Sequence, residues 1–222
     1  MRFGLDLAIF GPYADPDTLA DLAVAAEGAG WDAFFLWDHT VSAYQPEVTD
    51  PWIALTAAAV RTERLLLGPM VTPLARRRMT KLARETVALD HLSGGRLILG
   101  VGLGASDASE FTDFGDEDDP RARARILDES LALLDQLWSG EAVAREGADP
   151  QATSEPVLPR PPQQPRIPIR VAGTWPNKRP MRRAAAGDGA VPLTAAAGFA
   201  YQMSPQEMAE VKAFVEAERT HE

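Results

Sequence analysis

The residues best suited to chemistry in this chain are Asp38 and His39, which with Trp37 directly follow an apolar run at residues 31–36. A histidine changes charge near neutral pH, so it can act as a general acid or base. Catalytic groups collect at the carboxyl ends of parallel strands in barrel enzymes, and this pair follows an expected strand. Asp38 could instead cap loop amides while His39 packs on Trp37, and the residues alone leave both interpretations open.

Glycines end a second apolar run, at residues 97–101, and leave bare backbone at Gly102 and Gly104. A strand end without side chains allows a ligand to approach the backbone. The spacing does not match the dinucleotide fingerprint G-x-G-x-x-G. Close packing of a strand against a helix also explains such glycines. Taken alone, the segment favours this packing interpretation over ligand binding.

A third candidate site closes another apolar run, at residues 167–171. The run ends in Ala172, Gly173 and Thr174, and four cations follow, which are Lys178, Arg179, Arg182 and Arg183. A hydroxyl, cations and free amides at a helix start suit a phosphate group. A solvated basic helix is the alternative, but these cations stand out against a net charge of −10, so we expect phosphate binding. A further basic run, residues 76–78, could steer an anion or pair with the acidic run at residues 116–119, but we interpret it as solvated.

The composition limits the classes of protein to which the chain can belong. A net charge of −10 over 222 residues argues against binding to nucleic acid or to an anionic membrane surface. Cysteine is absent, which excludes disulfides and thiolate metal sites, and no apolar run is long enough to span a bilayer. Asp6 interrupts the apolar N-terminus, so we expect no signal peptide and predict a cytoplasmic location. The acidic run lacks the spacing of metal ligands, and no metal is predicted.

The apolar patterning predicts the elements that would position these groups. Continuous apolar runs predict buried strands at residues 3–9, 31–36, 65–71, 97–101, 167–171 and 190–193. Helical spacing predicts helices at residues 16–29, 51–60, 80–92, 120–139, 178–186 and 205–219. Buried strands separated by amphipathic helices indicate an α/β fold with a parallel sheet, either open or closed into a barrel. We predict a single domain over residues 1–222, with a proline-rich, extended insertion at residues 141–166.

Several separate motifs occur in the order typical of one known family. They are Trp31-Asp-Ala-Phe-Phe-Leu-Trp-Asp-His39, Leu67-Gly-Pro-Met-Val-Thr-Pro73, Leu89-Asp-His-Leu-Ser-Gly-Gly-Arg96 with Gly100-Val-Gly-Leu-Gly104, Leu137-Trp-Ser-Gly140 and Pro168-Ile-Arg-Val-Ala-Gly173. In these motifs the chain resembles the bacterial luciferase-like flavin-dependent oxidoreductases. The resemblance implies a TIM-like (β/α) barrel that binds a flavin, either FMN or the deazaflavin F420, at its C-terminal face.

The resemblance also implies roles for individual residues. Asp38 and His39 match the pair beside the reactive flavin ring, where His39 would act as an acid or base. A bulge behind the ring, which often contains a non-proline cis peptide bond, is matched by Met70, Val71 and Thr72. The remaining matches are to backbone close to the cofactor and to its phosphate-binding region, namely Gly102 and Gly104, and Ala172, Gly173, Thr174 and Arg179.

Three features depart from the family pattern, one being that the proline-rich stretch at residues 141–166 lacks the short strands usual in that insertion. Ala105 follows Gly104 where some F420-dependent dehydrogenases carry an acidic glutamate, which weakens the prediction of a sugar-phosphate dehydrogenase. Only about six of the eight βα units of a complete barrel can be identified. We therefore expect a truncated or reduced barrel, and we predict a homodimer in which the partner could cover the open edge.

Three hypotheses for the function follow. The first is a flavin-dependent oxidoreductase, either a luciferase-like monooxygenase or an F420-dependent hydride-transfer enzyme, that acts on an unknown small organic molecule. The second is a non-catalytic or vestigial flavin-binding barrel. The third is a phosphate-binding barrel enzyme without flavin. The order of the motifs favours the first.

Overall fold

The computed structural model of the protein describes residues 2–42, 45–105, 110–143, 154–194 and 203–219. Its strands are β1 (Gly4–Leu7), β2 (Ala33–Leu36), β3 (Leu66–Pro69), β4 (Thr72–Pro73), β5 (Leu99–Gly102), β6 (Ile169–Trp175) and β7 (Gly189–Thr194). Its α-helices are α1 (Pro16–Gly28), α2 (Pro51–Arg61), α3 (Met79–Ser93), α4 (Pro120–Ser139), α5 (Lys178–Ala186) and α6 (Pro205–Arg219). Strands and helices alternate as predicted, except that the expected third strand at residues 65–71 ends at Pro69 and a further short strand, β4, follows it.

The strands are parallel and form two sheets that continue into each other. β1, β2 and β3 pair in that order, and β4, β5, β6 and β7 pair in that order. A parallel bridge between Leu67, on β3, and Leu97, just before β5, joins the two sheets. The carboxyl ends of the strands therefore lie on one side, where the loops after β2, β4 and β5 meet.

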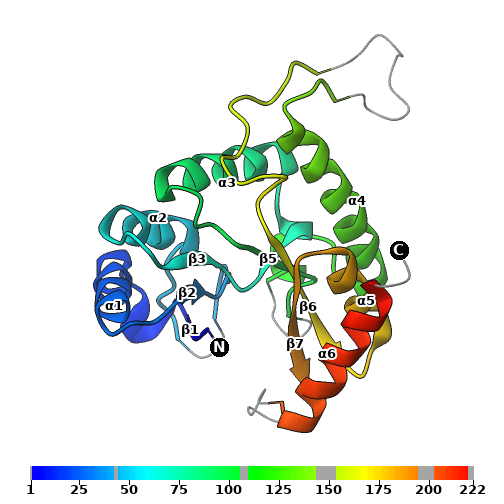
Figure 1. Ribbon diagram of the computed structural model, residues 1–222, viewed down its shortest axis with the longest axis horizontal. Helices are drawn as coiled ribbons and strands as arrows, with labels where there is room; N and C mark the ends of the chain where they lie inside the picture. Colours follow the sequence, from blue (N-terminus) through cyan, green and yellow to red (C-terminus); the bar gives the residue numbers. More distant parts are fainter. Residues whose placement is uncertain (1, 43–44, 106–109, 144–153, 195–202, 220–222) are drawn as a thin grey trace.

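Aspartate followed by proline begins three of the helices, as the sequence predicts. The side chains of Asp15, Asp50 and Asp119 accept hydrogen bonds from amides in the first turns of α1, α2 and α4. Each aspartate supplies a partner for amides that have none within the helix. The helices α1 to α4 then lie along the outside of the strands (Figure 1).

The main hydrophobic core lies between the strands and this outer layer of helices. Leu36 and Val101 contribute to it from the strands and Leu55 from α2, and all three are fully buried. A smaller buried cluster, which includes Phe35 and Ile98, lies on the opposite, inner face of the strands. Strands buried on both faces explain why the sequence shows continuous apolar runs rather than alternation.

The strands curl toward a barrel without closing it. The guanidinium carbon of Arg170, on β6, lies 5.6 Å from the ring centre of Phe35, on β2, so the inner faces of distant strands meet. Within the described residues, β1 pairs only with β2, and β7 pairs only with β6. The predicted incomplete (β/α) barrel is thereby confirmed, with its opening between β1 and β7.

The predicted proline-rich insertion at residues 141–166 contains no helix or strand in its described residues 154–166, as expected, and its residues 144–153 lie outside the described residues. Gln163 fixes this segment, because its side-chain nitrogen donates to Asp90 Oδ1 at 2.7 Å and to the carbonyl of Leu97 at 2.8 Å. Asp90 lies near the end of α3, and Leu97 lies just before β5. The segment therefore docks at the amino-terminal end of the strands, away from the three loops.

Candidate functional site

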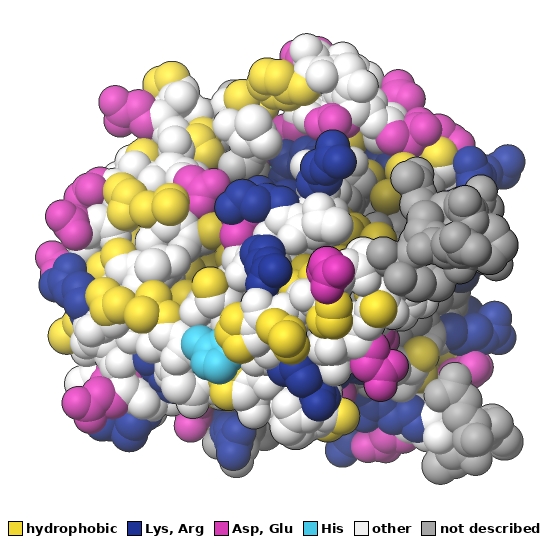
Figure 2. All heavy atoms as spheres, turned by 90° about the horizontal axis from the view of Figure 1, so that it is seen from above, with side chains coloured by type: hydrophobic (Ala, Val, Ile, Leu, Met, Phe, Trp, Pro, Cys, Tyr) yellow, Lys and Arg dark blue, Asp and Glu magenta, His cyan; other side chains and the backbone are white. Residues whose placement is uncertain are grey.

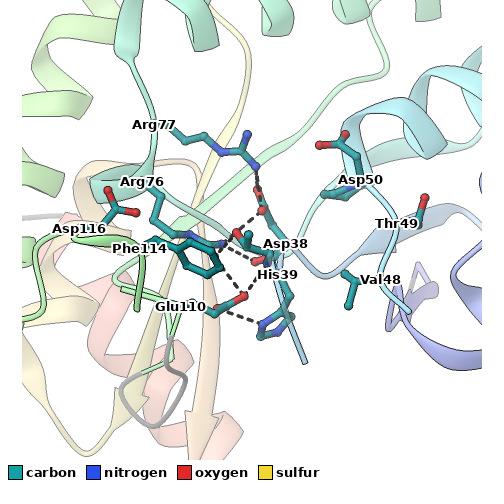
Figure 3. Close-up of a pocket in the computed structure, with 12 residues that line it drawn as sticks. Asp38, His39, Val48, Thr49, Asp50, Arg76, Arg77, Glu110, Phe114 and Asp116 are labelled. Atoms are coloured by element: carbon teal, nitrogen blue, oxygen red, sulfur yellow. Dashed lines mark hydrogen bonds and ion pairs between the residues drawn. The ribbon is translucent and has the colours of Figure 1, made fainter. Parts of the chain in front are cut away.

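The three loops at the carboxyl ends of β2, β4 and β5 form a pocket with a volume of about 390 Å³. Figure 3 shows that charged side chains from all three loops point toward one another there. The segment that leads into α2 forms the facing wall. The lining residues are Asp38, His39, Thr40, Val48, Thr49, Asp50, Pro51, Arg76, Arg77, Glu110, Phe114 and Asp116.

Asp38 is 4% exposed, and both of its carboxylate oxygens have partners. Thr72 Oγ1 donates to Oδ2 at 2.7 Å, and Arg77 Nη2 lies 2.8 Å from each oxygen. Arg76 Nη2 donates to the backbone carbonyl of Asp38, also at 2.8 Å. These partners compensate the negative charge of the buried carboxylate. Asp38 therefore ties the loop after β2 to the turn after β4 and acts as a positioning group.

Arg76 and Arg77 are not solvated as we predicted for residues 76–78, whereas Arg78 is exposed, as expected. The Arg76 side chain is only 6% exposed, and its Nη1 lies 3.1 Å from Glu110 Oε1. Arg76 and Arg77 pair with Asp38 rather than with the acidic run at residues 116–119. That prediction is wrong because the turn after β4 folds inward over two buried carboxylates, which need cations as partners.

Glu110 was missed by the sequence reasoning, although it is only 1% exposed and lies at the centre of the pocket wall. Its Oε1 accepts hydrogen bonds from the amides of Thr40 at 2.5 Å and Val41 at 3.3 Å. Its Oε2 lies 3.2 Å from Nδ1 of His39. The only signal in the sequence was an acidic residue in the loop after β5. Nothing in its spacing showed that this loop folds back onto the loop after β2.

The surroundings of Glu110 keep it ionised. Burial raises the pKa of its carboxyl, but the hydrogen bond with His39, the charge of Arg76 and the amide of Thr40 together lower it to about 2. The group is therefore a carboxylate at neutral pH and can only accept hydrogen bonds.

His39 lies between this carboxylate and the open side of the pocket, and its side chain is 27% exposed. Its ring packs against Phe10 and Trp37, with distances of 6.4 Å and 5.9 Å between ring centres. The contact with Trp37 agrees with the packing interpretation, and the position in the pocket agrees with the functional one. A histidine with one nitrogen held and the ring partly exposed can hold or move a proton.

Predicted cofactor positions from separate strands lie together beside the pocket network. The peptide bond between Met70 and Val71 is a non-proline cis bond, at the break between β3 and β4. A Cβ on Gly102, at the end of β5, would lie 2.8 Å from Val71 Cγ2 and 3.2 Å from the Cβ of Ala172, on β6. Gly104 has a φ of +80°, which favours glycine. The fold thus brings these positions close together, with Gly102 buried between Val71 and Ala172, and Thr72 of the same segment contacts the pocket network.

The expected phosphate-binding residues lie on β6 and α5, where most of the cations have partners. Lys178 Nζ lies 3.5 Å from the ring centre of Trp175. Arg182 pairs with Glu218, and Arg183 pairs with Asp128. These three cations are engaged in packing and ion pairs within the protein.

Gly173, Thr174 and Arg179 complete this region. A Cβ on Gly173 would lie 2.1 Å from the Cβ of Pro180, so the absence of a side chain lets β6 approach α5. Thr174 is partly exposed near the end of β6, and Arg179 is exposed in the first turn of α5. Thr174 and Arg179 therefore remain the predicted phosphate contacts, while close packing accounts for Gly173.

Charged side chains of both signs share the molecular surface. On the face shown in Figure 2, Lys and Arg side chains lie among Asp and Glu rather than in one field of a single sign. Within the described ranges, no group of three or more His, Asp or Glu side chains could hold a metal ion. No α-helix in the part of the chain that the structure describes is long and apolar enough to cross a membrane.

Comparison with known sequences connects this geometry to one family. The family model for luciferase-like monooxygenases matches residues 1–220. An F420-dependent glucose-6-phosphate dehydrogenase from Nakamurella multipartita is 34% identical over 187 residues, which cover 79% of this chain and 51% of that protein. The chain thus spans about half the length of this relative.

Two solved structures share the fold. Monooxygenase RslO1 from Streptomyces bottropensis has a TM-score of 0.78 at 28% identity, and the match covers 100% of this chain and 66% of that chain. The oxygenating constituent of 3,6-diketocamphane monooxygenase from Pseudomonas putida, in complex with FMN, has a TM-score of 0.76 at 20% identity and is 62% covered. Because the family model matches nearly the whole chain and the fold agrees, the chain belongs to the luciferase-like monooxygenase family.

Proposed function

We propose that the protein is a flavin-dependent oxidoreductase that uses FMN or F420 and acts on a small organic substrate. The observation that carries the proposal is the convergence of three loops at the carboxyl ends of the strands, which places His39 and Glu110 together at a pocket. A relative named as F420-dependent and a fold neighbour in complex with FMN support either cofactor. The adjacent Asp38 and His39 favour F420.

The residues present fit a flat ring beside the pocket. Gly102 is buried, and its missing side chain lets Val71 and Ala172 approach each other, while Met70, Val71 and Ala172 are partly exposed and would present apolar groups to the ring. Thr174 and Arg179 would contact the phosphate of the cofactor, because a hydroxyl and a guanidinium are suited to that group. When bound, the flavin would supply the hydride or oxygen chemistry.

The side chains of this chain would position and hold groups around that chemistry. Asp38, with Arg77, fixes the loop after β2 to the turn after β4. Glu110 ties the loop after β5 to the same network through Arg76. His39 is thereby presented to the pocket, where its ring can accept or deliver a proton.

Reconstitution with each cofactor tests the proposal. Purified protein would be incubated with FMN or with F420, and the visible absorbance and the mass of the released cofactor would be measured. We expect one cofactor to bind and its reduced form to be reoxidised in the presence of substrate. Riboflavin is the matched control for FMN, because it has the same ring without a phosphate and should bind more weakly.

Each of the other outcomes contradicts the proposal in a different way. If neither cofactor binds, the protein does not use a flavin. A bound flavin that never turns over with any reductant or with oxygen would support the non-catalytic alternative. A colourless protein that binds a sugar phosphate would support a barrel enzyme without flavin.

A further inference from the structure

We propose that Glu110 is a positioning residue that holds His39 in the tautomer with its proton on Nδ1, so that Nε2 is the nitrogen that exchanges protons in the pocket. The use of Nε2 in catalysis rests on the proposed function, whereas the tautomer itself does not. The argument depends on which hydrogen-bonding positions around Glu110 are already occupied.

The first step concerns the donor in the contact between the two side chains. Glu110 Oε2 lies 3.2 Å from His39 Nδ1, within hydrogen-bonding distance. A carboxylate has no proton to donate, so Nδ1 must carry the hydrogen. In a neutral imidazole the other nitrogen, Nε2, is then an acceptor with a free lone pair.

The second step shows that Glu110 cannot exchange this contact for another. Its Oε1 already receives the amide of Thr40 at 2.5 Å, the amide of Val41 at 3.3 Å and Nη1 of Arg76 at 3.1 Å. The side chain is almost completely buried, so water does not replace His39 at Oε2. The carboxylate is therefore fixed by donors from two other loops, and only Oε2 faces the imidazole.

The third step concerns the chain on either side of this carboxylate. Phe111, the next residue, is buried, and its ring centre lies 4.1 Å from the guanidinium carbon of Arg123 and 5.6 Å from that of Arg76. Arg76 Nη1 also donates to Thr40 Oγ1 at 2.9 Å. The contact of Arg76 with Phe111 and its hydrogen bond with Thr40 thus hold these two partners of Glu110 in place. The folded network therefore sets the orientation of His39.

His91 provides an internal comparison with the opposite tautomer. Its Nε2 lies 2.8 Å from the backbone carbonyl of Arg160, which can only accept a hydrogen bond. His91 should therefore carry its proton on Nε2 when neutral. The chain has three histidines, so substitution of His91 is enough to identify its signals and, with His221→Ala, those of His39.

Nitrogen-15 NMR of the full chain with labelled histidine measures both tautomers directly. The protonated and the bare ring nitrogens give well-separated chemical shifts, and each is recognised by its coupling pattern to the ring protons. At a pH where the rings are neutral, we expect the bare nitrogen to be Nε2 in His39 and Nδ1 in His91. A bare Nδ1 in His39, or rapid averaging of its two tautomers, would overturn the proposal.

The variant Glu110→Gln gives a second and sharper test. The three donors at Oε1 require the amide oxygen at that position, so the amide nitrogen would face His39 and donate to Nδ1. The tautomer of His39 should therefore switch to a proton on Nε2. Asp113→Asn, an exposed change of the same kind in the same segment, should leave the His39 spectrum unchanged.

The outcomes separate this inference from the proposed function. A Glu110→Gln protein that keeps the wild-type tautomer contradicts the positioning role, whatever cofactor binds. If this variant does not fold, the wild-type spectrum still decides the tautomer. Failure of the wild-type protein to bind FMN or F420 would overturn the proposed function and leave the tautomer assignment intact.

Discussion

At the scale of single residues, the pocket is held together by buried charge pairs. Asp38 and Glu110 line the pocket with almost no exposed area, and their charges are matched by Arg76 and Arg77. Desolvation makes such pairs costly to form, but loss of one partner is worse because it leaves an unpaired buried charge. The same charges would be of little consequence at the surface, where water screens them.

Asp38→Ala should therefore destabilise the protein strongly. The substitution removes the carboxylate that pairs with Arg77 and with Nη2 of Arg76. We expect the free energy of unfolding to fall by about 3–5 kcal/mol, because these cations lose a buried partner. Urea unfolding measures the change. Asp21→Ala removes the exposed ion pair with Arg61 and is the matched control, expected to cost less than about 1 kcal/mol. Equal effects of the two substitutions would show that the pocket network is not buried in solution.

Position after a strand placed His39 at the carboxyl end of the sheet but left its role open, and the resemblance to a family supplied the prediction that it acts as an acid or base. Glu110 could not be found in that way. It is 71 residues from His39 in the sequence, and it lies in a loop without periodicity. Only the fold, which brings the loop after β5 over the loop after β2, makes this acid a partner of the histidine.

At the scale of elements, local signals accounted for most boundaries and packing for the rest. Asp15 and Asp50 mark helix starts in the sequence because a cap and a following proline act locally. The break between β3 and β4 was not visible in the apolar run at residues 65–71. A run of apolar residues shows that a segment is buried but not whether its ladder is continuous, and the resemblance to a family supplied the expectation of a bulge.

The contact between β6 and α5 gives an element-scale prediction at Gly173. A Cβ there would lie 2.1 Å from the Cβ of Pro180, so Gly173→Ala must push the strand and helix apart. We expect a loss of about 1–3 kcal/mol in the free energy of unfolding, measured by urea unfolding. Gly28→Ala is the control, because a Cβ at the end of α1 would meet nothing within 4 Å and should be neutral or slightly stabilising. An unaffected Gly173→Ala protein would show that β6 and α5 are less closely packed than described.

At the scale of the whole molecule, the defining feature is the opening between β1 and β7. The repeating pattern of strands and helices predicted a parallel sheet but did not distinguish an open sheet from a barrel, since both bury the same kind of strand. The meeting of Arg170 with Phe35 across the inner face shows the curvature that a pattern of single residues cannot encode. The homodimer and the cytoplasmic location remain predictions.

The dependence of stability on pH tests the surroundings of Asp6, which lies on β1 beside the opening. Asp6 is exposed to solvent on β1, yet desolvation by the residues around it raises its pKa to about 6, although a hydrogen bond from Trp37 opposes the shift. A pKa raised above the ordinary value of 3.8 means that folding favours the protonated form. Its stabilising contribution is complete below the ordinary pKa and is lost as the pH rises through about 6.

Asp6→Asn should remove this dependence. The variant is expected to become increasingly more stable than the wild type as the pH rises from about 5 to about 7, as measured by urea unfolding at each pH. Asp17→Asn, on the exposed surface of α1, should show a constant difference from the wild type over the same range. A constant difference for Asp6→Asn as well would mean that the inner side of β1 is fully hydrated.

The docking of the proline-rich segment through Gln163 has a practical consequence for protein engineering. Gln163 attaches this segment to Asp90 and Leu97, at the end of the strands opposite the pocket. Leu158, in the same segment, is exposed and far along the chain from every residue that lines the pocket. A surface tether attached there would immobilise the protein while the pocket stays open to solution.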